Sequence, residues 1–160
     1  SNSDCTGQEC IAYKCKAKVG SWDLRNIPAP FVSDAIFVVG ANAPAMDVAS
    51  SVQISSMLIY KSGKTFESKL DNQITEADYS HNLIIIGNPC DNTMVKKVFG
   101  IECNGTNLND NQAIIKLADS RGKAALLVSG KTPLGTSEAA KRVANYETSG
   151  LSGSEIIINV

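Results

Sequence analysis

Short apolar runs and segments of helical spacing alternate along the chain from residue 34 onward. Three runs, at 34–40, 82–87 and 123–130, each end in a glycine and lead into a polar loop. Their apolar residues are continuous rather than alternating, which is typical of strands buried on both faces of a parallel sheet. A fourth apolar run, 155–160, closes the chain. The repeated order of strand, loop and helix predicts a mainly parallel sheet with right-handed crossover connections.

The segment after the first strand predicts a helix from residue 45 to about Met57. Pro44 suits its first turn, because the missing N–H of proline costs nothing there. We expect one face of this helix to cover the sheet. That face consists of Ala45, Val48, Ala49 and Val52. The residues that follow, 58–66, have the composition of a hairpin or of a strand with a turn.

Two helices are expected between the second and third strands. Asp91 or Asn92 can cap a short helix that ends at Gly100. Asp110 can cap another, which Gly122 closes. The apolar face of this second helix consists of Ala113, Ile114, Leu117 and Ala118. Both helices would belong to the connection between the strands at 82–87 and 123–130.

Together these elements predict an α/β fold of three layers, with a mainly parallel sheet of about four to five strands and helices on both faces. The last helix, 136–146, is expected to face the sheet with Ala139, Ala140, Val143 and Ala144. A length of 160 residues suits one such domain. The first 30 residues show little periodicity and hold three cysteines. We therefore divide the chain into a Cys-containing N-terminal extension, 1–30, and an α/β domain, 31–160.

Composition narrows the classes of function. Apolar residues make up 43% of the chain and aromatic residues only 6%, so the core is expected to be aliphatic. The 15 basic and 16 acidic residues are interspersed and give a net charge of −1. This excludes the basic surface that is typical of nucleic-acid binding. The longest apolar runs have only a few residues, so no membrane span is predicted.

The five cysteines indicate an oxidising compartment. Cys5, Cys10 and Cys15 lie in the extension, where one pair of them is expected to form a disulfide. Cys90 and Cys103 are expected to form a second disulfide, which would tie a short helix to the loop after it. An odd count leaves one cysteine whose partner the sequence does not identify.

Cys90 also has a catalytic interpretation. It follows a strand and a glycine at the start of a helix, where a nucleophile elbow would lie and where a thiol pKa is lowered. The single histidine, His81, precedes the same strand, so the two residues are expected to lie roughly 17 Å apart, too far for a base and its nucleophile. His81 and the three N-terminal cysteines lack the short paired spacing of zinc ligands. A disulfide at Cys90 is favoured over a thiol nucleophile, with other pairings left open.

The loops that follow the strands are the usual ligand sites of open α/β sheets. Their candidate ligand residues are Asn42, Asp47, Asn88, Lys131 and Thr132. None of the loops has the glycine pattern of a phosphate-binding motif, so structural loops are favoured and no cofactor or metal is predicted. We expect Asp47, near the start of its helix, to be solvated or to pair with the helix dipole.

Several blocks of the sequence resemble the domains of archaeal S-layer proteins. Residues 82–92 are similar to an "NLIxIGGPCxN" segment of that family, and Cys103 matches a cysteine downstream of it. Further similar blocks are 34–47, 113–117, 125–130 and 139–146, the last resembling a closing "AAKVLANY" helix. The resemblance implies an exported, disulfide-bonded and glycosylated surface domain with no catalytic residues. An N-glycosylation sequon, Asn104-Gly105-Thr106, agrees with this.

Three hypotheses about function follow. The first is a non-enzymatic structural or interaction domain of an exported archaeal cell-surface protein, located outside the cell. Its partners would be other envelope proteins, glycans or further copies of the chain, and neither nucleic acid nor membrane. The second is a cell-wall or glycan-binding module that uses the strand-exit loops. The third is a cysteine-dependent hydrolase that uses Cys90.

Overall fold

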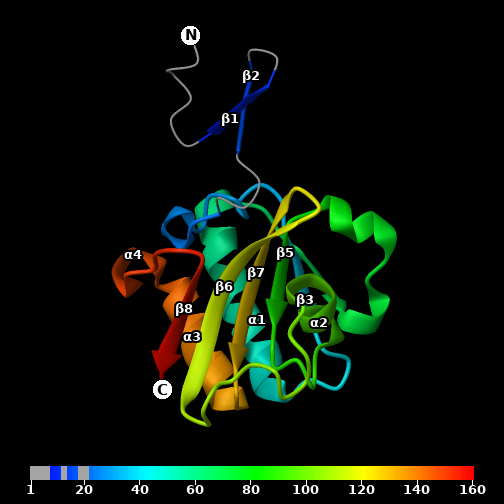
Figure 1. Cartoon of the computed structure of the whole chain (residues 1–160), viewed down its shortest axis with the longest axis vertical. Helices are drawn as coiled ribbons and strands as arrows, with labels where there is room; N and C mark the ends of the chain where they lie inside the picture. Colours follow the sequence, from blue (N-terminus) through cyan, green and yellow to red (C-terminus); the bar gives the residue numbers. More distant parts are fainter. Residues whose placement is uncertain (1–7, 12–13, 18–21) are drawn as a thin grey trace.

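The computed structural model describes residues 8–11, 14–17 and 22–160. The first two of these segments are strands β1 (Gln8–Ile11) and β2 (Lys14–Ala17), which pair antiparallel as a small hairpin (Figure 1). The disulfide predicted among Cys5, Cys10 and Cys15 depends on side chains that lie outside the described part of the chain.

Six strands form one mixed sheet in the order β4-β3-β5-β7-β6-β8. The first four strands in this order, β4, β3, β5 and β7, are parallel to one another. Strand β6 runs antiparallel to both of its neighbours, β7 and β8. The bounds are β3 (Ile36–Val39), β4 (Glu67–Leu70), β5 (Leu83–Ile86), β6 (Gln112–Ser120), β7 (Lys123–Gly130) and β8 (Glu155–Asn159). The sheet is thus larger than the four to five strands predicted, and it is mixed.

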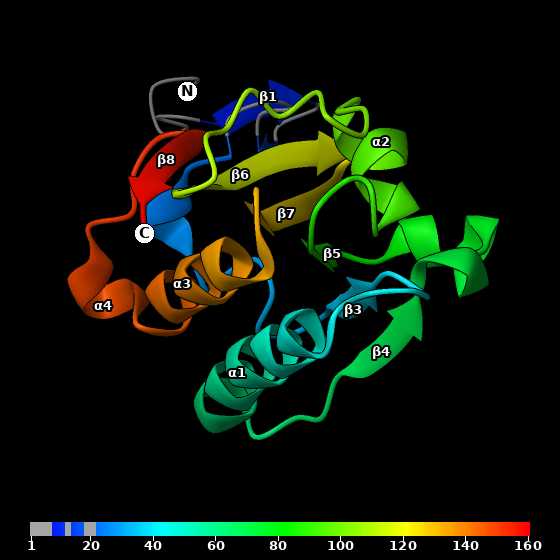
Figure 2. The same cartoon turned by 90° about the horizontal axis from the view of Figure 1, so that it is seen from below.

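Helices cover both faces of the sheet, as predicted. Helices α1 (Ala45–Ser62) and α3 (Pro133–Ala144) pack side by side on one face, and α2 (Thr93–Phe99) lies on the other (Figure 2). The strands alternate their side chains between two aliphatic clusters. In β5, Ile84 and Ile86 join the cluster under α1 and α3, whereas Leu83 and Ile85 join the one under α2. The last helix runs from Pro133 to Ala144 rather than over 136–146. Of its predicted face, Ala139, Ala140 and Val143 are buried in the cluster under α1 and α3, whereas Ala144 is only partly buried.

The helix predicted from Asp110 to Gly122 is wrong, because this segment forms strand β6. Arg121 and Gly122 both have positive φ, 52° and 85°, and join β6 to β7 as a tight hairpin in which Ser120 lies opposite Lys123. Positive φ at both central positions is what a two-residue hairpin turn of type I′ requires. The apolar pattern of the segment is compatible with either element, and pairing with β7 and β8 decides in favour of the strand.

Helix α1 differs from the prediction in its length and in the face that it buries. It continues to Ser62 and ends at Gly63, which has a left-handed conformation with φ 70°. Residues 58–62 are therefore helical and form no hairpin. The buried positions are Asp47, Ser50, Ser51, Ile54 and Leu58, so the face predicted to cover the sheet, including Val48 and Val52, is exposed.

The segment between residue 22 and β3 packs into the α/β core. Leu24, Ile27 and Phe31 are buried in the cluster under α1 and α3. Leu24 N–H donates to the carbonyl of Gly153, 2.8 Å away, near the start of β8. This segment therefore closes the end of the sheet opposite the strand-exit loops.

Candidate functional site

The strand-exit edge of the sheet is where an open α/β fold normally binds its ligand. Strands β3, β5 and β7 lead here into Gly40, Gly87 and Gly130. The buried side chain of Asn92 fills the crevice between the first two strands. Its Nδ2 donates to the carbonyls of Val38 and Ile86, at 3.0 and 2.9 Å. Groups of the protein itself therefore occupy this part of the edge.

Two glycines at the edge allow segments of backbone to pack directly on the strand ends. A Cβ at Gly40 would overlap the carbonyl oxygen of Asp91, and a Cβ at Gly130 would overlap the backbone nitrogen of Thr136. In phosphate-binding loops, glycines instead let a phosphate approach the backbone. Here the close approach is made by the chain itself, which agrees with the prediction of structural loops.

Asp47, a candidate ligand residue, lies in the first turn of α1 and is only 1% exposed. A Cβ at Gly87 would stand 2.7 Å from its Oδ2. Among the described residues, its Oδ1 has no hydrogen-bond partner. Burial raises the pKa of Asp47 to about 6, the charge of Asp91 adds to this, and the Thr136 hydroxyl opposes it. The expected solvated position of Asp47 is wrong, because α1 packs with a different face from the one predicted.

Asp71 is a second buried carboxyl group at this edge. Unlike Asp47, it accepts hydrogen bonds at both of its oxygens. Its Oδ1 accepts from the N–H groups of Ala41 and Asn72, at 2.8 and 2.9 Å. Its Oδ2 accepts from Thr93 N–H at 2.9 Å and Thr93 Oγ1 at 2.8 Å. Burial alone would raise the pKa of Asp71, but these donors outweigh it and lower the pKa. Asp71 thus ties the exits of β3 and β4 to the start of α2.

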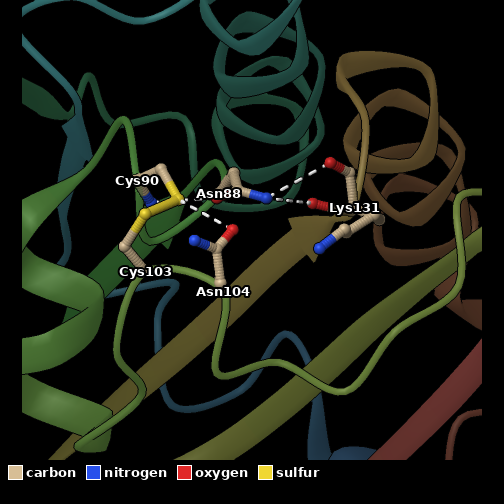
Figure 3. The surroundings of a disulfide bond; sticks show 6 residues. Asn88, Cys90, Cys103, Asn104 and Lys131 are labelled. Atoms are coloured by element: carbon tan, nitrogen blue, oxygen red, sulfur yellow. Dashed lines mark hydrogen bonds between the residues drawn. A yellow bond between two sulfur atoms is a disulfide. The ribbon is translucent and has the colours of Figure 1, made fainter.

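The disulfide predicted between Cys90 and Cys103 is present (Figure 3), with Cα atoms 4.4 Å apart. It links the loop that precedes α2 to the loop that follows this helix. Asn104 Oδ1 lies 3.9 Å from Cys90 Sγ. In this state Cys90 has no thiol to act as a nucleophile, and His81 lies before β5 whereas Cys90 lies after it. His81 Nδ1 instead contacts Asp34 Oδ1 at 2.7 Å.

Asn88 holds two of the exit loops together. Its Nδ2 donates to the carbonyls of Gly130 and Lys131, at 3.3 and 3.2 Å, and its Oδ1 accepts from Cys90 N–H at 2.9 Å (Figure 3). A glycan-binding role for Asn88 would have to break these bonds. The side chain therefore positions the loops after β5 and β7 relative to each other.

The other candidate residues do not converge on one site. Asn42 is exposed in the turn after β3. Thr132 is the N-cap of α3, where its hydroxyl accepts from Gly135 N–H at 3.3 Å. Asn104 is exposed, with φ 66°, and is thus accessible for modification at the sequon. Lys131 is partly buried, next to the loop that Asn88 holds.

Sequence reasoning missed the two residues that organise this edge. Asn92 was considered only as a helix cap, which it is, since its Oδ1 accepts from Met94 N–H at 3.1 Å. Its bridge between β3 and β5 depends on strands that are distant in the sequence. Asp71 showed no signal at all, because its four donors come from three separate segments.

A pocket on the remaining surface lies away from the strand-exit edge. It has a volume of about 440 Å³ and is found where the C-terminal end of α1 meets α4 (Tyr146–Ser149), and Tyr60, Lys61, Tyr146 and Glu147 contribute to its lining. Within residues 8–11, 14–17 and 22–160, no three side chains of metal-binding type cluster together. No helix of this part of the chain is long and apolar enough to cross a membrane.

No protein-family model matches the sequence, and no curated protein is significantly similar to it. Among solved structures, 31 chains match. One of them, titled "Structure of CpGH84D", matches with a TM-score of 0.49 and 17% sequence identity over 79% of this chain. The chain spans 20% of the length of that structure. This likeness is too low to support an assignment of function.

Proposed function

We propose that this chain is a non-enzymatic structural or interaction domain of an exported cell-surface protein, of the archaeal S-layer type that its sequence blocks resemble. The observation that supports the proposal most is the closed strand-exit edge. The place where an α/β enzyme holds its substrate contains Asn92, Asn88 and tightly packed backbone. This arrangement stabilises the fold at the position where catalysis would need an open crevice.

The disulfide supports export in particular. Disulfides persist in oxidising compartments and are rare where cellular reductants act. The bond joins Cys90 to Cys103 within the closed edge, so it strengthens the same region that the asparagine side chains hold. A sequon asparagine, Asn104, follows directly and is exposed, which agrees with glycosylation during export.

Thiol chemistry on the native chain tests the proposal. The protein is isolated from the envelope fraction of the cells that produce it and treated with iodoacetamide without reduction. Peptide mass spectrometry should then find Cys90 linked to Cys103 and no label on Cys90. A Cys103→Ala variant is the matched control, since it frees the Cys90 thiol for labelling.

Three results would contradict the proposal in different ways. Rapid labelling of Cys90 in the unreduced wild type would support the cysteine-dependent hydrolase instead. Recovery of the chain only from the cytoplasmic fraction would refute export. Binding to isolated wall glycans that Asn42→Ala abolishes would support the glycan-binding module.

A further inference from the structure

The pocket between the C-terminal end of α1 and α4 is separate from the strand-exit edge. Helix α1 begins at that edge, and the pocket lies at its other end. We call it the α1–α4 pocket. Its volume of about 440 Å³ falls within the range of small-molecule sites, which is about 300 to 1,000 Å³. Its lining combines aromatic, apolar and uncharged polar side chains with one ion pair, and these groups restrict the kind of molecule that it can hold.

Two tyrosine rings form the aromatic part of the pocket. Tyr60, near the end of α1, is 86% exposed, so its ring offers an open face to another molecule. Tyr146 and Met57 are partly buried and pack against the cluster under α1 and α3. They give the pocket an apolar wall that the core holds in place. An exposed aromatic ring beside such a wall suits a ligand that has a flat apolar face.

The charges of the pocket compensate each other. Lys61 Nζ donates to Glu147 Oε1 at 2.7 Å, and this bond raises the pKa of Lys61 and lowers the pKa of Glu147. Nζ also lies 5.9 Å from the centroid of the Tyr60 ring and 5.5 Å from that of Tyr146. Lys61 thus already takes the place at which the two rings would hold a cationic ligand. Because Glu147 compensates its charge, the pocket favours an uncharged ligand over an anion as well.

The hydrogen-bonding groups that remain for a ligand are mostly acceptors. Ser56 Oγ and Thr148 Oγ1 donate their protons to backbone carbonyls, at 2.8 and 3.3 Å, so each hydroxyl oxygen can only accept a further bond. Glu147 Oε1 accepts from Lys61 and also from the Tyr146 hydroxyl at 3.0 Å. Among the described residues, no donor reaches Glu147 Oε2. A ligand that satisfies these oxygens must supply several donors, and Lys61 keeps N–H groups for its acceptors.

A pyranose sugar meets all of these conditions. It has no charge, one side of its ring consists of C–H groups that pack on an aromatic ring, and its hydroxyls both donate and accept. From this complementarity we infer that the α1–α4 pocket binds a neutral saccharide, with a sugar ring on Tyr60 and hydroxyls bonded to Glu147 and Lys61. The inference goes beyond the proposed function, because binding here needs neither the strand-exit edge nor the disulfide. A single sugar unit buries little surface, so we expect a dissociation constant on the order of millimolar.

An NMR titration of the isotope-labelled chain tests the site. The probes are the methyl glycosides of glucose, mannose, galactose and N-acetylglucosamine, each added up to about 50 mM. At least one of them should shift the amide signals of Tyr60, Lys61, Glu147 and Thr148 in a saturable way. Tetramethylammonium and inorganic phosphate represent the two ionic alternatives, and neither should cause a saturable shift of these signals.

Substitutions then identify the side chains that bind. Tyr60→Ala should weaken the binding by about tenfold, whereas Tyr60→Phe, which keeps the ring, should retain it. Glu147→Ala should weaken it by about fivefold or more, because the hydroxyls lose an acceptor. Tyr60 and Glu147 are exposed, so all three variants should keep the thermal midpoint of the wild type. Leu134→Ala is the matched control: Leu134 is 53% exposed on α3, outside the pocket lining, and the variant should bind as the wild type does.

Three results would overturn the inference. The first is the absence of a saturable shift with all four glycosides. The second is a saturable shift of the pocket signals with tetramethylammonium or phosphate in place of the glycosides. The third is saccharide binding that Tyr60→Ala leaves intact and Asn42→Ala abolishes, which would assign it to the strand-exit loops. The thiol test on Cys90 uses another part of the molecule, so the saccharide site and the non-enzymatic proposal fail separately.

Discussion

Asp47 should make the stability of this protein depend on pH. Its carboxyl group is buried, and Oδ1 has no partner among the described residues. The folded-state pKa of about 6 lies above the ordinary value of 3.8. Between these values the folded state binds more protons than the unfolded state does, so the free energy of unfolding falls as the pH rises. We therefore expect Asp47 to lower stability most above pH 6, and to have little effect below about pH 4.

The size of the effect follows from the shift. A difference of one pKa unit corresponds to about 1.4 kcal/mol, so a rise from 3.8 to about 6 costs about 3 kcal/mol once the group is ionised. Asparagine has nearly the same shape and cannot ionise. In Asp47→Asn this contribution to the pH dependence should disappear, whatever constant offset the amide introduces.

Urea unfolding followed by circular dichroism measures the effect, with wild type and Asp47→Asn compared at pH 4, 5, 6 and 7.5. The difference in unfolding free energy should move by about 2.5 kcal/mol in favour of the variant between pH 4 and pH 7.5. Asp110→Asn, at an exposed position, should show no such movement. A difference between wild type and Asp47→Asn that stays constant across this range would refute the argument.

Three further predictions concern the strand-exit edge. Replacing Cys90 and Cys103 together by alanine removes a link across 13 residues and should lower the unfolding free energy by about 3 kcal/mol in urea; an unchanged midpoint would contradict this. Asp71→Ala leaves the N–H and hydroxyl donors of Thr93 without their acceptor and should lower the unfolding free energy by about 3 kcal/mol at neutral pH; a urea midpoint equal to that of the wild type would contradict this. Gly130→Ala should lower the thermal midpoint by at least about 4 °C, since its Cβ would overlap backbone; a wild-type midpoint in calorimetry would disprove it.

The strands and helices that were predicted correctly are those for which the local sequence pattern favours one type of secondary structure. The aliphatic runs of β3, β5 and β7 are short and continuous and lead into glycines, which favours strands buried on both sides, and the structure buries them so. The helix predicted at 136–146 is present at Pro133–Ala144, and three of the four residues of its predicted face, Ala139, Ala140 and Val143, are buried. The disulfide between Cys90 and Cys103 could be expected because both lie close in the sequence around one short helix.

Other elements depend on partners that the local sequence does not contain. Residues 113–118 suit a helix or a strand equally, and the neighbouring strands β7 and β8 select the strand. The environments of Asp47 and Asp71 differ only through the segments that fold around them, and these set the pKa values in opposite directions.

The sequence by itself determined that this chain builds a sheet from aliphatic strands and joins two of its cysteines beside a short helix. Only the tertiary structure decided which face of α1 the sheet covers. Local apolar periodicity favours the side with Val48 and Val52, but the packing of α1 against α3 and β3 buries Ile54 and Leu58 instead. Periodicity shows that a helix has an apolar face, whereas the contacts of the whole fold decide whether that face meets the core or stays exposed to solvent.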